Sequence, residues 1–441
     1  MDTTPFIDRR TRLLARMTEL GGGVAILPTA TEKPRNRDNP YPYRADSYFQ
    51  YLTGFTEPEA VLVLVAGDDA RSILFCRDRD PDQEIWDGFR CGPERAPETL
   101  GVDEAHSIKS LGEKLPDLIA NRPALWHSLG FDAAWDERIG NALNAVRAQA
   151  RTGKRTPAVM YDLRTALDEM RLIKDAHEIA LMRRAADIAA AAHRRAMRAA
   201  APGRWEYEIE AEFLHEFRRS GSQSPAYSTI VASGAGGCIL HYIANDRQMR
   251  DGELLLIDAG CELDGYASDI TRTFPVNGRF SGAQEDVYEL VEAAQAAAIA
   301  TIRPGAHFMA AHEAALKVIA QGLVDLKLLH GSVDGVIESE SYKRFFMHRT
   351  SHWLGMDVHD VGDYKTSESK DEWRSLAPGM VLTVEPGCYI RAADDVPAAF
   401  HDIGIRIEDD VLVTADGGEV LTAAAPKSIA DIEALMADRS T

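Results

Sequence analysis

The chain contains short runs of continuous apolar residues, each bounded by glycine, proline or charged positions. The clearest run is Leu254–Ile257, and Asp258 follows it directly. Such a run predicts a β-strand that is covered on both faces. A carboxylate at the end of a buried strand is costly unless a positive charge or a hydrogen-bond donor faces it. Asp258 is therefore expected to have a specific partner.

Similar runs alternate with helical patterns in the first part of the chain. Strands are predicted at "GGGVAIL", "EAVLVLVA", "RSILFCR" and "PALWHSLGF", and helices at "SLGEKLPDLIA" and "RIGNALNAVRAQA". Strands that alternate with helices indicate an α/β domain. The polar and proline-containing segments "RNRDNPYPYRADSYFQY" and "FRCGPERAPETLG" are expected to be loops.

A long helical pattern begins at Ala176 and marks a domain boundary. Asp175 and Glu178 fit a capping box, and "APG" at 201–203 ends the pattern. The chain is longer than one hydrophobic core usually serves. We expect two domains, residues 1–172 and residues 173–441.

The second domain contains a weak internal repeat. The segment "DGELLLIDAGC" (251–261) aligns with "PGMVLTVEPGC" (378–388), so that Asp258 corresponds to Glu385. The period of 127 residues is too long for a solenoid. It predicts two related halves around a shared centre, although two unrelated buried strands could also produce the match.

A second carboxylate is expected beside Asp258. The dipeptide Asp264-Gly265 is typical of a tight hairpin turn, and the hairpin would bring Asp269 back towards Asp258. Paired strands lie roughly 4.8 Å apart, so the two carboxylates need a proton or a cation between them.

Further ligand-type residues occur later in the chain. Glu408 follows an alternating apolar stretch, and Arg406 is expected on the same strand face. The segment "FFMHRTSHWLGMDVHD" places His348, His352 and His359 within twelve residues. A single histidine in such a setting is usually a core residue, whereas three together favour a site.

Four carboxylates and an imidazole make an oxygen-rich ligand set. Such a set suits Mn²⁺, Co²⁺, Fe²⁺ or Zn²⁺ better than an ion that prefers thiolates. Two divalent ions about 3.5 Å apart would balance the four negative charges. On residue chemistry alone the alternative is a set of structural acids paired with Arg272 and Arg406.

Charge and cysteine content narrow the possible functions. The 441-residue chain has a net charge of −20, which disfavours nucleic acid and anionic membranes as partners. No stretch is apolar over the ~18 residues that a membrane span needs, and the start of the sequence lacks a signal-peptide pattern. The five cysteines are scattered without a CxxC pair, so disulfides are not expected. We expect a cytoplasmic protein.

The segments "IDAGCELDGYASDITRTFPV", "MHRTSHWLGMDVHD", "TVEPGCYI" and "GIRIEDD" occur in this order. Together they resemble the bacterial aminopeptidase P family, the Xaa-Pro aminopeptidases, and the resemblance is strongest over residues 225–425. It implies an α/β (α+β) fold, with a creatinase-like N-terminal α/β domain and a C-terminal pita-bread domain of two pseudo-symmetric αββ halves. This fold would also account for the internal repeat.

The resemblance implies a role for each candidate residue. Asp258 would bind one of two divalent metal ions, most simply Mn²⁺ but also Co²⁺ or Zn²⁺, and Asp269 and Glu408 would bridge both ions. His352 and Glu385 would bind the other ion, with Glu385 as general base for a metal-bridging water. His241, His348 and His359 would line the site as catalytic residues that stabilise the tetrahedral intermediate or shuttle protons. Arg406 would hold a ligand carboxylate in place.

The family cleaves the N-terminal Xaa–Pro bond of peptides that have proline at the second position. Proline gives a tertiary amide without an N–H group, which a shaped pocket can favour. Trp86 in "EIWDGFRCG" resembles a residue that covers a neighbouring subunit's site, and Arg151 in "RTGKR" resembles a substrate-side arginine. Both short matches also suit an ordinary exposed aromatic and a solvated basic run. The resemblance to a family in which dimers and tetramers are common implies a homo-oligomer.

One position departs from the family pattern. Arg349 stands where the family usually has glycine after the histidine, and it would narrow the entrance or change substrate preference.

Two other functions are considered. Prolidase uses the same five ligands on Xaa-Pro dipeptides, so the ligand set does not exclude it. A catalytically silent pita-bread protein used for binding would be expected to have lost ligands, whereas all five are present.

Overall fold

The computed structural model describes residues 2–366 and 372–438. The chain divides into two compact units, Met1–Met170 and Arg171–Thr441. Each unit has its own hydrophobic core. Among the described helices, none has the combination of length and apolar character that crossing a membrane requires.

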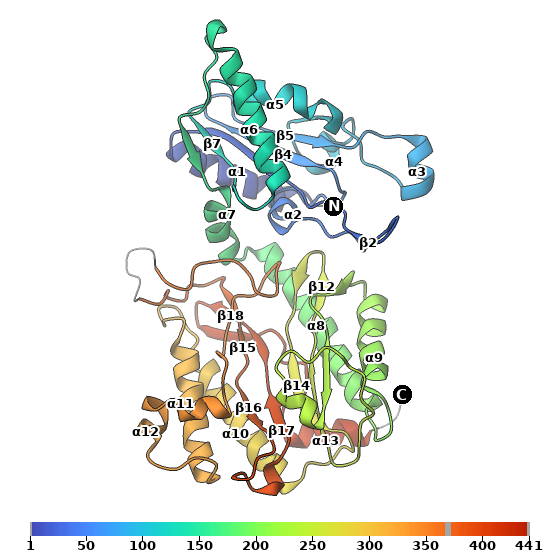
Figure 1. Cartoon of the computed structure of the whole chain (residues 1–441), viewed down its shortest axis with the longest axis vertical. Coiled ribbons are helices and arrows are strands. Elements are labelled where there is room, and N and C mark those ends of the chain that lie inside the picture. The colour runs from blue at the N-terminus through green and yellow to red at the C-terminus, as the bar shows by residue number, and fades with distance from the viewer. Residues whose placement is uncertain (1, 367–371, 439–441) are drawn as a thin grey trace. The chain divides into compact units, whose positions relative to one another are not determined.

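The first unit is an α/β domain with a mixed sheet at its centre (Figure 1). Its strands are β1 (Gly23–Pro28), β2 (Pro34–Asn36), β3 (Asn39–Pro40), β4 (Val61–Ala66), β5 (Arg71–Cys76), β6 (Glu104–Ser107), β7 (Ala124–Trp126) and β8 (Val159–Tyr161). Its helices are α1 (Thr4–Glu19), α2 (Ser47–Thr53), α3 (Pro81–Asp87), α4 (Ala96–Leu100), α5 (Leu111–Ile119), α6 (Ala133–Ala148) and α7 (Leu163–Leu172). The strand order is β6-β5-β4-β1-β7-β8, with β2 and β3 in a separate hairpin.

The predicted apolar strands form the centre of this sheet. β1 pairs antiparallel with β4 and parallel with β7, so that the strand direction changes at β1. Val24, Val63 and Phe75 on one face pack with Leu115 of α5 and Val146 of α6. The α/β character predicted from the alternation of strands and helices is confirmed.

Two segments that were expected to be loops contain short helices. α2 begins after Asp46, whose side chain accepts a hydrogen bond from the Phe49 N–H, and it ends at Gly54 in the left-handed conformation. α4 lies in the second segment and ends at Gly101 in the same conformation. The Asp46 cap starts α2, a proline in the first turn starts α4, and a left-handed glycine ends each helix. These short helices lack the long apolar periodicity on which the prediction relied.

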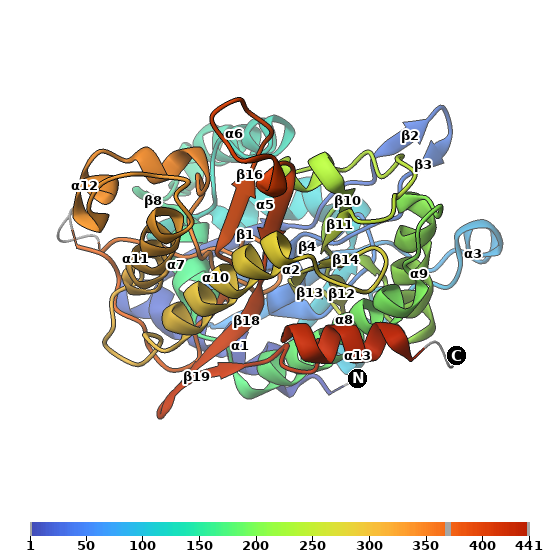
Figure 2. The same ribbon diagram turned by 90° about the horizontal axis from the view of Figure 1, so that it is seen from below.

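The second unit has two halves, each with a helix pair beside antiparallel strands (Figures 1 and 2). The helices are α8 (Ala176–Ala199) and α9 (Glu206–Arg219) in the first half, α10 (Gly282–Ile299) and α11 (Ala310–Asp325) in the second, then α12 (Val333–Glu338) and α13 (Ile429–Ala437). The first half contains β9 (Ser224–Pro225), β10 (Ile230–Ser233), β11 (Leu254–Asp258), β12 (Cys261–Leu263), β13 (Tyr266–Ala267) and β14 (Thr271–Pro275). The second contains β15 (Val381–Val384), β16 (Gly387–Ile390), β17 (Ile403–Arg406), β18 (Asp409–Thr414) and β19 (Gly417–Val420).

The sequence repeat corresponds to a structural repeat. Gly252 and Gly379 precede β11 and β15 with φ angles of 82° and 90°, a region that glycine adopts without strain. Asp258 ends β11, and Glu385 follows β15. The two halves therefore place an acid at the same end of corresponding strands.

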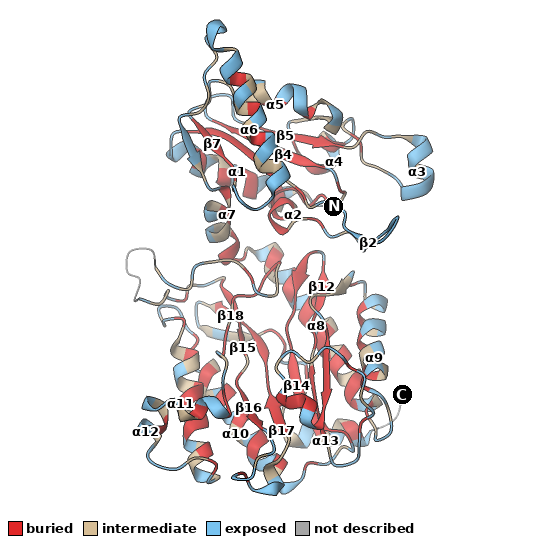
Figure 3. Cartoon of the chain, viewed as in Figure 1, coloured by how far each residue is buried: buried red, intermediate tan, exposed pale blue. Residues whose placement is uncertain are grey.

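The strands of the second unit form its buried centre, while its long helices bury one face each (Figure 3). The predicted capping box is present at the start of α8, where Asp175 and Glu178 exchange side-chain and backbone hydrogen bonds. Buried alanines along α8 let the helix lie close to the strands, in agreement with the apolar pattern of the sequence.

A buried ion pair joins the two halves. Arg272 of β14 and Asp409 of β18 are fully buried, with 2.7 Å between Nη2 and Oδ1. Nη1 of Arg272 also donates to the carbonyl of Glu408, so the pair fixes backbone as well as charge. Burial by itself raises the pKa of Asp409, but Arg272 and Lys427 lower it to about 2.

We expect Arg272→Met to lower the free energy of unfolding of the second unit by about 3 kcal/mol, because the buried Asp409 charge loses its fully buried partner and keeps the partly exposed Lys427. The measurement is urea unfolding of the metal-free chain. Arg344→Met, which removes the exposed pair of Arg344 with Asp395, is the matched control and should change little. An effect of Arg272→Met no larger than the control would contradict the prediction.

The stabilising effect of this pair should depend on pH in one direction. The folded-state pKa of Asp409 lies below its ordinary value of 3.8. Its contribution is therefore complete above about pH 4 and is lost as the pH falls towards 2. The advantage of the unaltered chain over Arg272→Met should shrink over that range.

Candidate metal centre

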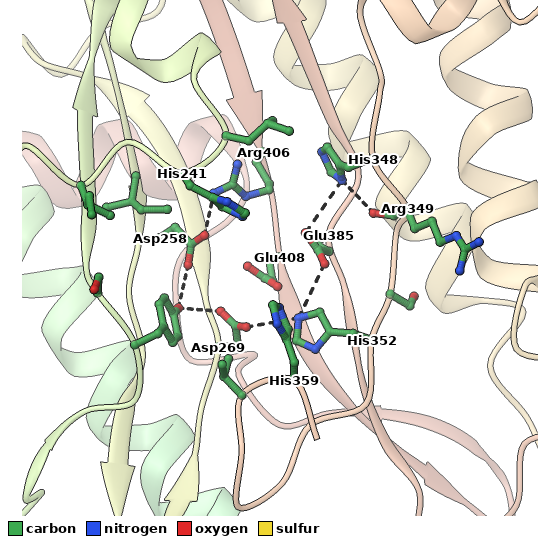
Figure 4. Close-up of a pocket in the computed structure, with 17 residues that line it drawn as sticks. His241, Asp258, Asp269, His348, Arg349, His352, His359, Glu385, Arg406 and Glu408 are labelled. Carbon is green, nitrogen blue, oxygen red and sulfur yellow. Dashed lines mark hydrogen bonds and ion pairs between the residues drawn. The ribbon is translucent and has the colours of Figure 1, made fainter. Parts of the chain in front are cut away.

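The second unit contains a cavity of about 480 Å³ between its two halves (Figure 4). Polar and ionisable side chains converge on it from strand ends and loops that are far apart in the sequence. It brings together every candidate residue of the second domain: His241, Asp258, Asp269, His348, Arg349, His352, His359, Glu385, Arg406 and Glu408.

The acids reach the cavity because each lies at a strand end. The turn Asp264-Gly265 has φ angles of 51° and 87°, as a two-residue type I′ hairpin requires. The returning chain places Asp269 just before β14, whose residue Thr271 pairs with Asp258. Glu408 occupies the gap between β17 and β18. The hairpin predicted from the sequence is confirmed.

Three of the side chains are close enough to share one cation. Ligand atoms of Asp269, His352 and Glu408 all lie within 4.8 Å of one another. His352 Nε2 is 3.5 Å from an oxygen of Asp269 and 3.7 Å from an oxygen of Glu385. Nδ1 of the same ring is 3.0 Å from the Trp353 carbonyl, which leaves Nε2 facing the carboxylates.

The charges at this point are not balanced by the side chains alone. Burial raises the pKa of Glu385 to about 7, and burial with the neighbouring carboxylates raises the pKa of Glu408 well above its ordinary value. Burial lowers the pKa of His352, but Asp269 and Glu385 outweigh it and raise that pKa to about 9. Each shift opposes the accumulation of negative charge, which a divalent cation would neutralise. The donor set thus fits a metal ion.

Arginine pairing accounts for only one of the acids. Arg406 Nη2 lies 2.6 Å from Asp258 Oδ2, and both groups are largely buried. Arg272 instead binds Asp409 and backbone carbonyls. The sequence left open that the acids are structural and are neutralised by these two arginines. Asp258 is paired in this way, whereas Glu385 forms no such pair with either arginine.

Two histidines border the carboxylates. His348 lies with Nδ1 3.9 Å from Glu385 and with Nε2 2.8 Å from the Tyr389 hydroxyl, and burial lowers its pKa to about 4. The ring of His359 stands edge-on to that of His352, with 4.3 Å between centroids. His241 lies in the exposed loop that closes another side of the cavity.

Two tyrosines belong to the site although the sequence did not indicate them. The Tyr227 hydroxyl lies 2.7 Å from Asp258 Oδ1 and 2.5 Å from Asp269 Oδ1. Tyr389 accepts a hydrogen bond from Arg406 Nη1 at 3.0 Å. Tyr227 precedes β10, so only the pairing of β10 with β11 brings it near the acids. The one available signal for Tyr389 is its position four residues after Glu385.

The remaining candidates are exposed, one at the cavity and two in the first unit. Arg349 is exposed at the cavity rim, with its guanidinium 5.4 Å from the centre of the Trp373 ring. Two candidates belong to the first unit and are exposed: Trp86 on α3, and Arg151 in a 3₁₀-helix (Ala150–Thr152). Neither is among the residues that line the cavity.

Comparison with known proteins agrees with this geometry. Residues 180–415 match metallopeptidase family M24, and residues 6–126 match the aminopeptidase P N-terminal domain. The predicted combination of an N-terminal α/β domain with a C-terminal pita-bread domain is confirmed.

Related proteins match over almost the whole chain. The Xaa-Pro aminopeptidase of Escherichia coli (strain K12) is 47% identical over 98% of this chain and 97% of its own length. The structure of Pseudomonas aeruginosa aminopeptidase PepP has a TM-score of 0.96 and 49% identity, covering 100% of this chain and 99% of that one. Zinc-substituted E. coli aminopeptidase P in complex with product has a TM-score of 0.96 and 46% identity, with the same coverage.

These relatives favour the aminopeptidase over the prolidase and the silent binding protein that the sequence left open. The metallopeptidase match covers more than half of the chain and includes all five ligand-type residues. The chain belongs to metallopeptidase family M24 and, within it, to the Xaa-Pro aminopeptidases.

Proposed function

We propose that this chain releases the first residue of peptides that have proline at the second position, using two divalent metal ions. One observation carries the proposal, the convergence of four carboxylates and one imidazole on a single cavity in a chain of this family. Two ions would balance the four negative charges without further cations from the protein.

We assign the ligands residue by residue. Asp258 would hold one ion, His352 and Glu385 the other, and Asp269 and Glu408 would touch both. The closeness of Asp269, His352 and Glu408 supports the shared positions. Mn²⁺ is the ion we propose, because oxygen-rich sites with one imidazole suit it.

The ions, when bound, supply an acidified water and a polarised substrate carbonyl. Glu385 is proposed as the base that takes the proton of the attacking water and passes it to the leaving proline nitrogen. Asp258 is proposed as the partner of the free α-amine of the peptide, which would restrict cleavage to the first bond. His241, His348 and His359 border the cavity, and they are proposed to stabilise the charge that develops on the substrate carbonyl or to shuttle protons.

A homo-oligomer, a dimer or tetramer, is also proposed. Trp86 is 83% exposed, and its neighbours Ile85 and Phe89 are 79% and 92% exposed. Monomeric proteins seldom leave three large apolar side chains together in water. We propose that Trp86 covers the active site of a neighbouring copy, and that Arg151 reaches the far end of a bound peptide.

A cytoplasmic location is proposed on the basis of the thiols. The five cysteines are free, and four are buried. Burial raises the pKa of Cys388 to about 12, so this thiol stays protonated and unreactive. Free thiols are typical of reducing compartments.

With added Mn²⁺, the protein should release alanine from Ala-Pro-Ala and cleave the dipeptide Ala-Pro very little. A chelator should abolish the reaction, since the acids hold their ions reversibly. Chromatography of free alanine measures both substrates. Cleavage of the dipeptide alone would identify a prolidase, and no cleavage by protein shown to hold Mn²⁺ would contradict the proposed substrate class.

Asp258→Asn should reduce bound Mn²⁺ below two equivalents and lower kcat at least ~100-fold. The amide removes one negative charge, but its oxygen can still accept from Arg406. Its NH2 group can donate to the Tyr227 hydroxyl oxygen, whose proton goes to Asp269, so the fold should survive. Metal analysis of dialysed protein is the measurement. The exposed Asp395→Asn is the matched control, and two retained equivalents in Asp258→Asn would refute the assignment.

Trp86→Ser should shift the oligomer towards smaller species, because truncating an anchoring tryptophan commonly costs about 2 kcal/mol or more of binding energy. Light scattering across a concentration series measures the mass, and KM for the tripeptide should rise with dissociation. Leu20→Ser, at another exposed apolar residue of the first unit, should change neither. Unchanged mass and KM in Trp86→Ser would count against the shared site.

A further inference from the structure

Two backbone carbonyls beside the site accept hydrogen bonds from the same buried side chain. Val384 directly precedes Glu385, and Ile407 directly precedes Glu408, and both residues are fully buried. A buried carbonyl without a hydrogen bond is costly. One side chain serves both: Nε2 of Gln295 lies 3.1 Å from the Val384 oxygen and 3.2 Å from the Ile407 oxygen.

Gln295 is held in a single orientation. It is fully buried on α10, and its Oε1 accepts a hydrogen bond from Lys427 Nζ at 2.9 Å. An ammonium group only donates, so it fixes the oxygen of the amide towards itself and the nitrogen towards the two carbonyls. Asp409 Oδ2 adds to this arrangement, 3.1 Å from Nε2 and 2.8 Å from Lys427 Nζ.

The same network reaches the far side of Glu408. Arg272, paired with Asp409, donates to the carbonyl of Glu408 itself and to that of Thr271 at 3.0 Å. The peptide groups on both sides of Glu408 are thus fixed, one by Gln295 and one by Arg272. Gln295 adds a side-chain link to the segment that carries Glu385, beside the backbone hydrogen bond from the Ile407 N–H to the Pro386 carbonyl.

The first half of the unit has a simpler counterpart. His193 of α8 is fully buried, and its Nε2 lies 3.2 Å from the carbonyl of Ala259, the residue after Asp258. Burial lowers the pKa of His193 to about 3, so the neutral ring donates one N–H. In each half the long helix that leads into the strands therefore holds a carbonyl next to an acid of the site.

We propose that Gln295 is a positioning residue that sets the spacing of Glu385 and Glu408, and through it the affinity for the pair of metal ions. The inference rests on one part of the proposed function, namely that Glu385 and Glu408 bind metal ions. Gln295 itself touches the backbone and not the cavity. Metal–oxygen distances tolerate only about 0.2 Å of error, so a small separation of the two segments weakens binding.

The test is a titration of the metal-free, full-length chain with Mn²⁺ by calorimetry. Gln295→Met keeps the length and approximate volume of the side chain but removes both donors. We expect its affinity for Mn²⁺ to fall about 10–100-fold, as for other residues that orient metal ligands. At saturating Mn²⁺ the KM for Ala-Pro-Ala should stay within twofold of the unaltered chain.

Gln284→Met on the same helix is the matched control. Gln284 also donates to a backbone carbonyl, that of Gly252 at 2.9 Å, and belongs to the capping box of α10. Its loss should lower the melting temperature of the metal-free protein without changing the Mn²⁺ affinity. Equal Mn²⁺ affinities of the two variants would overturn the proposal, since Gln295 would then matter only for stability.

Lys427 provides a second test should Gln295→Met fail to fold. The Lys427 side chain is 30% exposed, so its substitution should disturb folding less than substitution of the fully buried Gln295. Lys427→Met frees the Gln295 amide to turn and should weaken Mn²⁺ binding, whereas Lys427→Arg keeps a donor and should restore it. Equal affinities in these two variants would overturn the proposal. An unaltered chain that binds no Mn²⁺ would instead remove the proposed function, which separates the two failures.

Discussion

The repulsion among four carboxylates in one buried cavity is the constraint on which the second unit depends. Asp258, Asp269, Glu385 and Glu408 would separate if nothing opposed their charges. Burial, and after it the neighbouring carboxylates, raises the pKa of Glu385 and of Glu408. The chain contributes only partial compensation, chiefly Arg406 against Asp258. The remaining imbalance is what makes the site suitable for divalent cations.

Buried polar side chains hold in place the backbone segments that carry the acids. Arg272 and Asp409 form a fully buried ion pair at the junction of the two halves, and Gln295 connects the segments of the two glutamates. A buried ion pair is weak evidence for stability by itself, because desolvation offsets much of the attraction. Here Arg272 also donates to the backbone carbonyls of Thr271 and Glu408, and this gives the pair a role in geometry. The helices therefore position the acids as well as covering the sheets.

Part of this arrangement follows from local sequence. The apolar run before Asp258, the turn at Asp264-Gly265 and the repeat that relates Asp258 to Glu385 were sufficient to predict strand ends, a hairpin and two related halves. Hydrophobic periodicity and turn chemistry are local properties, so they can be recognised without the fold. The same reasoning missed α2 and α4, because short helices depend on capping groups more than on periodicity.

The sequence by itself determined which chemical groups are available and which strand ends carry them, since residue type and spacing set both. Only the tertiary structure decided which of these groups are in contact. The Tyr227 hydroxyl lies within hydrogen-bond distance of two acids, and Arg406 pairs with Asp258 whereas Arg272 pairs with Asp409. Gln295 binds the carbonyls that precede Glu385 and Glu408. These contacts join residues that are tens to more than a hundred positions apart. The geometry of these contacts depends on the packing of the two halves. A local sequence pattern therefore does not predict which buried polar group will face which backbone carbonyl.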